Sequence, residues 1–219
     1  MNDKLLMPFV THKMFNDSNL PNGYHVIKVG NGDFDLPESW LEDNTGDKMA
    51  SLNLYYCELA AQYWARKNYP SNYKFFRLSH YRRYFFNYRR KRSKSWKGDV
   101  VHETDIARIL TKKKVIIPIP TVKCPRYGRL YHHKGNSEEK DWLLTREIIK
   151  EHFPEYLDSF NKVLYGGLAI WDNMFITTRD VADDYSAWLF AAFSKFNEEL
   201  DKGMTPRLLE RMATWLSIY

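Results

Sequence analysis

Residues 72–86 read NYKFFRLSHYRRYFF, and this stretch decides the fold because it changes character at its middle. Its first half is dense in aromatic and apolar residues, which is typical of a buried strand. At His80 the sequence becomes polar and basic, as expected for a turn. We therefore predict a buried strand that runs into a turn at His80.

Short strands alternate with helices on both sides of this stretch. The expected strands are residues 4–10, 24–29, 115–120 and 168–177. The expected helices are residues 54–67, a helical turn at 105–110, a helix that a capping box at Asn136 and Glu139 starts and that runs through His152, residues 154–165, residues 181–200 and a last one from 205. Residues 31–47 are predicted to be a loop. The alternation favours a three-layer α/β fold with a mostly parallel central sheet and a helical C-terminal part, about 181–219. With no internal repeat and no linker, residues 1–219 are predicted to form a single domain.

Three polar segments are candidates for the ligand-binding edge of this sheet. They are Thr11-His12-Lys13, residues 43–47 and residues 80–83. In open parallel sheets, ligands bind beyond the carboxyl ends of the strands. We expect all three segments to lie at that edge.

Positive charge is concentrated in residues 77–97, which hold nine Lys and Arg and no Asp or Glu. The whole chain has a net charge of +6, so the remainder is slightly acidic. Such a concentration suits a polyanion: a nucleotide pyrophosphate, a lipid pyrophosphate, an anionic membrane or nucleic acid. Within it, His80 stands beside Arg82 and Arg83, and arginine pairs well with phosphate oxygens. The alternative for these three residues is a solvated basic edge.

The segment DNTGD at residues 43–47 groups two carboxylates, an amide and a hydroxyl around one glycine. It is either a local turn or a loop that hydrogen-bonds a base, a ribose or a sugar. Glu58 interrupts an aromatic helix face, and is either a solvated carboxylate, an acceptor for sugar hydroxyls or a catalytic base.

Several classes of protein are not indicated. The two cysteines, Cys57 and Cys124, have no zinc-type spacing and fit a reducing cytoplasm. There is no glycine-rich phosphate loop, no dinucleotide fingerprint and no nucleophile-elbow serine. No secretory signal and no apolar stretch of membrane-spanning length are present, so we expect a cytoplasmic protein.

A series of short strings resembles a known family over almost the whole chain. The strings are THK at 11–13, DNTGD at 43–47, YYCEL at 55–59, YWARKN at 63–68, HYRRYF at 80–85, REIIK at 146–150, PEY at 154–156, NMFI at 173–176 and ERM at 210–212. They resemble the bacterial capsular and exopolysaccharide glycosyltransferases long catalogued as a domain of unknown function. Two features depart from that pattern: the run at residues 89–97 is more basic, and residues 204–208 lack an expected Gly-Phe.

The resemblance implies a GT-A-like fold and transfer of a sugar from a UDP-sugar to a lipid-linked or growing surface polysaccharide, such as capsule, exopolysaccharide or O-antigen. Galactofuranose is one candidate sugar. The donor-binding residues it implies are Thr11, His12, Lys13, Asp43, Asn44, Thr45, Asp47, Tyr56, His80, Arg82, Arg83 and Asn173.

The resemblance also leads to expectations about a divalent metal ion and about the catalytic base. Many GT-A enzymes hold a divalent metal with an Asp-x-Asp pair, where this chain carries residues 80–83. We therefore expect cationic side chains to neutralise the leaving diphosphate, with no metal and no cofactor. An inverting transfer needs a carboxylate base, for which Asp141, Asp172 and Glu58 are candidates; capping, solvation and substrate binding are their alternatives.

The basic loop at about 87–100 is predicted to face an anionic membrane or a lipid-linked acceptor at the inner face of the plasma membrane. Its membrane or acceptor contacts are expected from Arg89, Arg90, Lys91 and Arg92. Two other functions use the same basic, aromatic patch: a nucleic-acid-binding module and a non-catalytic membrane-surface protein. No recognised nucleic-acid motif is present, so no nucleic-acid partner is expected.

Overall fold

The computed structural model describes residues 4–18, 20, 24–30, 33–49, 56, 58–69, 73–81, 83–86, 100–122, 139–166, 168–169 and 173–200. These residues divide into two compact units. The first comprises residues 1–118 and 174–184, and the second comprises residues 119–173 and 185–219. The expected last helix from residue 205 lies outside the described residues, as do Arg82, Asp172 and the basic loop at 87–99.

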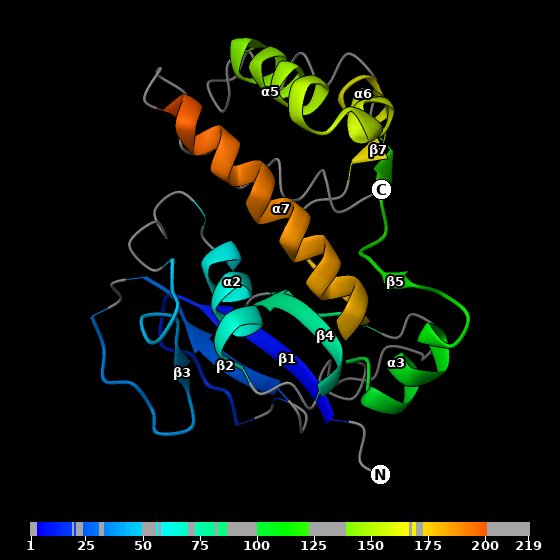
Figure 1. The fold of residues 1–219 in the computed structure, drawn as a ribbon. Helices are drawn as coiled ribbons and strands as arrows, with labels where there is room; N and C mark the ends of the chain where they lie inside the picture. The colour runs from blue at the N-terminus through cyan, green and yellow to red at the C-terminus, as the bar shows by residue number, and fades with distance from the viewer. Residues whose placement is uncertain are drawn as a thin grey trace. The chain divides into compact units, whose positions relative to one another are not determined.

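A six-stranded sheet forms the centre of the first unit, in the order β3-β2-β1-β4-β8-β5 (Figure 1). Its strands are β1 (Lys4–Thr11), β2 (Tyr24–Lys28), β3 (Leu41–Glu42), β4 (Tyr73–His80), β5 (Val115–Ile116) and β8 (Phe175–Thr178). The four strands from β3 to β4 are parallel, and only β8 runs antiparallel to its neighbours. The prediction of an α/β fold with a mostly parallel sheet is confirmed.

Residues 73–80 of the stretch NYKFFRLSHYRRYFF form the central strand β4. Residues from Phe75 to Ser79 are all buried, and the strand ends at His80, where the backbone turns. Its neighbours β1 and β8 shield it on both sides in the sheet. The predicted buried strand and the turn at His80 are therefore confirmed.

Among the described residues, three helices belong wholly or partly to the first unit. Helix α2 (Glu58–Asn68) packs against β1, and α3 (Glu103–Leu110) packs against β5 and β8. Ile106 of α3 is fully buried in a cluster with Phe75 and Ile176 of the sheet. Helix α7 (Arg179–Leu200) begins in the first unit directly after β8 and continues into the second.

The second unit is mainly helical among the described residues. It contains α5 (Glu139–His152), the 3-10 turn η4 (Pro154–Tyr156), α6 (Leu157–Tyr165) and a two-stranded antiparallel sheet of β6 (Thr121–Val122) and β7 (Leu168–Ala169). Pro154 starts η4, and α6 is capped by Gly166, as the sequence predicts. The predicted helical C-terminal part is confirmed as far as residue 200.

One predicted strand is wrong. Residues 168–177 were expected to form a single strand, but they form β7 and β8, which lie in different sheets and different units. Asn173 and Met174 have no strand structure and separate the two. Apolar composition alone does not reveal such a change of partner, since Leu168-Ala169 in β7 and Phe175-Ile176 in β8 are equally apolar. The predicted loop at 31–47 also contains the two-residue strand β3.

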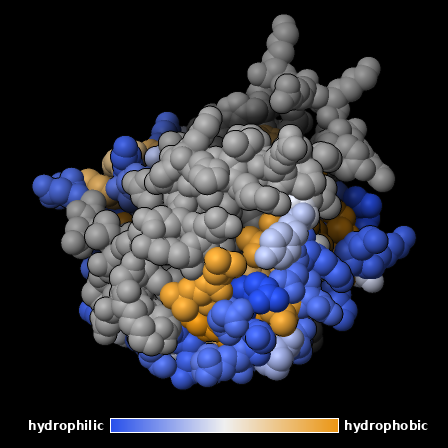
Figure 2. Space-filling model, turned by 90° about the horizontal axis from the view of Figure 1, so that it is seen from above, coloured by the Kyte–Doolittle hydropathy of each residue, from blue (hydrophilic) through white to orange (hydrophobic). Residues whose placement is uncertain are grey.

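Among the described residues, none of the helices is long and apolar enough to cross a membrane. Figure 2 shows that apolar side chains on the face seen from above are interrupted by strongly hydrophilic ones.

Candidate functional site

The three predicted ligand segments meet at one edge of the six-stranded sheet. In the parallel register, Thr11 pairs with Lys28, Val10 with His80, and Lys28 with Glu42. All these residues stand at the carboxyl ends of their strands. Hydrogen bonds extend the alignment beyond the strands, from Tyr81 N to Val10 O (3.0 Å) and from Asp43 N to Lys28 O (3.2 Å). The sequence-based expectation of a shared edge is therefore confirmed.

This edge contains the point where the strand order reverses. The chain continues from β1 to β2 and β3 on one side, and then returns to place β4 on the other side of β1. In open α/β sheets such a reversal leaves a crevice beyond the carboxyl ends, because the two loops diverge. Here the diverging loops carry His12 and His80, whose ring centroids lie 6.3 Å apart. Tyr81 packs on both, at 5.5 Å from His12 and 4.5 Å from His80.

The loop after β1 is shaped by Thr11. Its side chain is fully buried, and its hydroxyl accepts a hydrogen bond from Lys13 N (3.1 Å) and donates one to Lys13 O (2.6 Å). Such a hydroxyl turn reverses the backbone within two residues. As a result His12 and Lys13 are exposed at the edge, while the hydroxyl of Thr11 is engaged by the backbone of Lys13.

Asp43 is the buried carboxylate of this edge. Its side chain is 2% exposed, and Gly30 N–H donates a hydrogen bond to it. Its Oδ2 atom has no hydrogen-bond partner in the part of the chain that the structure describes. Burial raises the pKa of Asp43 to about 6, since a carboxylate loses hydration there. An acceptor oxygen without a donor inside a protein is costly, and a ligand N–H or O–H would satisfy it.

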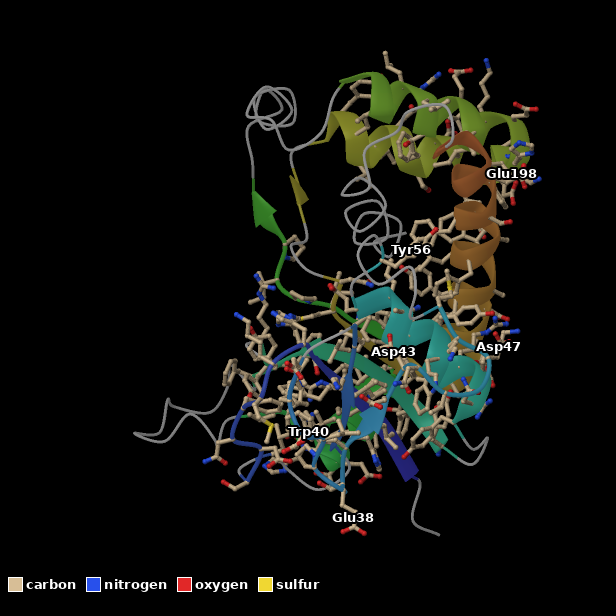
Figure 3. The ribbon with its side chains drawn as sticks, turned by 90° about the vertical axis from the view of Figure 1, so that its left-hand side faces the viewer. Glu38, Trp40, Asp43, Asp47, Tyr56 and Glu198 are labelled. Atoms are coloured by element: carbon tan, nitrogen blue, oxygen red, sulfur yellow. The ribbon has the colours of Figure 1, made fainter. Side chains whose placement is uncertain are left out.

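The remainder of the 43–47 segment is anchored on α2 (Figure 3). Trp64 Nε1 donates to the backbone carbonyl of Thr45 (2.9 Å), and Tyr63 OH donates to Asp47 Oδ1 (2.9 Å). Asn68 closes the anchor, accepting from Asp47 N (3.0 Å) and donating to Asp47 O (2.7 Å). Thr45 and Asp47 are therefore held mainly by α2, through contacts 16 to 21 residues along the chain, and a local turn does not account for them.

Arg77 departs from the sequence-based interpretation. It is one of the nine basic residues of the segment 77–97, whose concentrated charge suits a polyanion, but its side chain is fully buried in β4. Its guanidinium lies over the rings of Tyr24 (4.6 Å) and Phe85 (5.2 Å) and donates a hydrogen bond to Tyr24 OH. Burial lowers its pKa to about 9. Its place in the alternation of the strand, between Phe75 and Ser79, was the signal that could have revealed this burial.

The structure places the other predicted residues as follows. Tyr56 is fully buried, Glu58 is half-buried at the start of α2, and Arg83 is exposed after the turn, where its N–H donates to His80 O (2.8 Å). Asn44 is exposed and bonds Glu42. Asn173 is 2% exposed, and neither polar atom of its side chain has a partner among the described residues.

Two of the three candidate bases fall within the described residues, one in each unit. Asp141 lies in the first turn of α5, in the second unit, and Glu58 lies in the first unit. Asp172, Arg82 and the predicted acceptor residues Arg89, Arg90, Lys91 and Arg92 lie outside the described residues. Their roles stay predictions. No group of three or more His, Cys, Asp or Glu suited to a metal ion occurs in the described ranges.

Comparison with known proteins places the chain in a family. The sequence profile described as "Domain of unknown function (DUF4422)" matches residues 7–218. The chain belongs to this family. The match spans both compact units, and the prediction of one domain over residues 1–219 stays a prediction.

A solved structure shares the fold. The apo structure of WbbM, a bifunctional glycosyltransferase, superposes with a TM-score of 0.76 at 20% sequence identity. The similarity covers 97% of this chain and 40% of that chain, so this chain spans less than half of WbbM. At this identity the likeness shows a shared glycosyltransferase-type fold. The comparison with curated proteins found no match.

Proposed function

We propose that this protein is a glycosyltransferase that takes its sugar from a nucleotide-sugar donor. The observation that carries the proposal is the sheet edge where the loops after the paired strands β1 and β4 diverge. Exposed Lys13 and the His12–His80 pair lie there, next to the loop that holds buried Asp43. The fold shared with WbbM supports the same reaction class.

The donor site divides into a base end and a phosphate end. Asp43, with its unpartnered Oδ2 atom, suits the N–H or hydroxyl groups of a base or ribose. His12, Lys13 and Arg83 are donors suited to a diphosphate, and Arg82 adds a further guanidinium in the sequence. Uridine is the proposed base, and galactofuranose is a candidate sugar. Both come from the family resemblance.

Transfer forms a bond between an acceptor hydroxyl oxygen and the anomeric carbon, while the bond from that carbon to the diphosphate oxygen breaks. Negative charge then grows on the leaving diphosphate, and fixed cationic donors stabilise it without reorganisation. His80 or His12, when protonated, can also pass a proton to that leaving group. The acceptor proton goes to a carboxylate, for which Asp141, Asp172 and Glu58 remain the proposed candidates.

The acceptor is proposed to be a lipid-linked or growing surface polysaccharide. The support is the family resemblance together with the basic residues 89–97, which suit an anionic membrane or a lipid phosphate. We therefore propose that the enzyme acts at the inner face of the plasma membrane, where such an acceptor would be found.

A thermal-shift screen with nucleotides tests the donor. Ligand that binds the folded state raises the melting temperature by mass action. We expect a selective shift with UDP or a UDP-sugar, and loss of that shift when Arg82 and Arg83 are both replaced by Ala. Lys150→Ala and Lys162→Ala, both exposed in the second unit, form the charge-matched control. A shift with oligonucleotides alone would instead support a nucleic-acid-binding module.

Metal independence has its own test. Activity with a UDP-sugar donor is expected to persist in EDTA, because fixed cations replace the metal. Loss of activity in EDTA, restored by Mg²⁺ or Mn²⁺, would contradict this part of the proposal and leave the donor assignment intact.

A further inference from the structure

An aromatic cluster in the second unit is not used by the donor site. Trp188 of α7 packs on Tyr156 of η4, with ring centroids 4.6 Å apart and ring planes 38° apart. Phe153 meets the same indole edge-on at 6.2 Å, and Tyr185 lies one turn before it at 6.4 Å. None of the four side chains is buried; all are partly exposed. Tyr and Trp are enriched at binding interfaces, because their rings combine a large apolar face with a polar group.

The cluster also holds a hydrogen-bond donor without an acceptor. Trp188 Nε1 is shielded from solvent and has no hydrogen-bond partner in the described part of the chain. A buried tryptophan N–H ordinarily finds an acceptor, because an unmade bond costs free energy. Glu151 and Glu155, which are close to Phe153 and Tyr156 in the sequence, carry exposed carboxylates. Ring faces, an N–H donor and carboxylate acceptors together match a pyranose or furanose ring, which has apolar C–H faces and hydroxyls at its rim.

We propose that Tyr156 and Trp188 form a saccharide-binding platform that holds a sugar of the acceptor glycan. This assignment rests on the proposed function for the identity of the ligand, and the two are tested separately. The string PEY at 154–156 thereby gains a function, because η4 is the short turn that brings Tyr156 onto Trp188.

Saturation-transfer NMR with free hexoses tests the platform. The probes are glucose, galactose, mannose and N-acetylglucosamine, each at millimolar concentration with the full chain. We expect transfer to the ring protons of at least one hexose. Tyr156→Ala should weaken that binding about tenfold, as loss of a stacking ring worth roughly 1.4 kcal/mol predicts.

Trp188→Phe is the second variant, because it keeps a ring in place and removes only the N–H. It should weaken binding about fivefold, in line with one hydrogen bond. Phe190→Leu is the matched control: it removes a ring from the same helix, where Phe190 packs on Phe193, and should leave hexose binding unchanged.

The outcomes separate the two proposals. The platform is overturned if the wild type gives no saturation-transfer signal with any hexose, or if the signal survives both Tyr156→Ala and Trp188→Phe. A UDP-induced thermal shift that persists in these variants shows that the donor site is intact. An NMR saturation-transfer signal from a hexose that Trp188→Phe weakens, with no change of melting temperature on addition of UDP, would uphold the platform and refute the donor assignment.

Discussion

The two ends of the loop at residues 43–47 carry the same side chain in opposite environments. Asp43 is 2% exposed, and its Oδ2 atom has no hydrogen-bond partner in the described residues. Asp47 is exposed; it accepts a hydrogen bond from Tyr63 and forms an ion pair with Lys67. One carboxylate is held ready for a donor group, and the other is already satisfied by α2. A motif of five residues can thus combine a binding group with the anchor that positions it.

The largest expected effect concerns the anchor. Gly46 has φ +58°, and an added Cβ would lie 2.0 Å from Asn68 Oδ1, the atom that accepts from Asp47 N. Gly46→Ala should lower the free energy of unfolding by about 2 kcal/mol, from backbone strain and displaced hydrogen bonds. Urea denaturation measures it. Asn44→Ala, in the same loop and exposed, is the control; equal losses in the two variants would show that Gly46 is under no such constraint.

The next effect concerns the binding end. Asp43→Asn keeps the shape of the side chain but removes its charge and one of its acceptor oxygens. We expect UDP to bind about tenfold more weakly, as expected for loss of a charge-assisted hydrogen bond. Asp47→Asn is the matched control and should change UDP affinity less than twofold. Isothermal titration calorimetry gives both values, and equal effects would remove the distinction between the two carboxylates.

The same contrast predicts a pH dependence of stability. The pKa of Asp43 is raised to about 6 in the folded protein, from an ordinary value of 3.8. The folded state therefore binds this proton more tightly, and stability rises as pH falls from 7 through 6. Between pH 7 and pH 5 the gain is about 1 kcal/mol. Wild type minus Asp43→Asn isolates it in urea denaturation; a difference that is flat, or that rises with pH, contradicts the assignment.

Much of this arrangement could be predicted from the sequence. The change of character at His80 predicted the central strand and its turn, because a dense run of aromatic and apolar residues is buried in a sheet and the polar segment after it is not. The rule for parallel sheets then gave the common edge of Thr11, Asp43 and His80. Such patterns in neighbouring residues are sufficient to predict a feature that depends on those residues alone, such as a buried strand or the turn that ends it.

Other features depended on partners far along the chain. The split of residues 168–177 follows from which strands β7 and β8 pair with, and no local pattern encodes that choice. The burial of Arg77 follows from Tyr24 and Phe85, which supply the rings around its charge. The different states of Asp43 and Asp47 likewise arise from α2, which offers its hydrogen bonds to only one of them.

The smallest expected effect tests what holds Asp47 to α2. Lys67 Nζ lies 3.4 Å from Asp47 Oδ2, but both side chains are about half exposed, so water screens the pair. Lys67→Gln should cost about 0.3 kcal/mol of stability, and 1 M salt should remove even that difference. Asn68→Ala, which deletes hydrogen bonds to both the N–H and the carbonyl of Asp47, should cost more than 1 kcal/mol. If Lys67→Gln proves as costly as Asn68→Ala, then charge rather than hydrogen bonding fixes the loop, and the stability of the loop would depend on Asp47 being ionised.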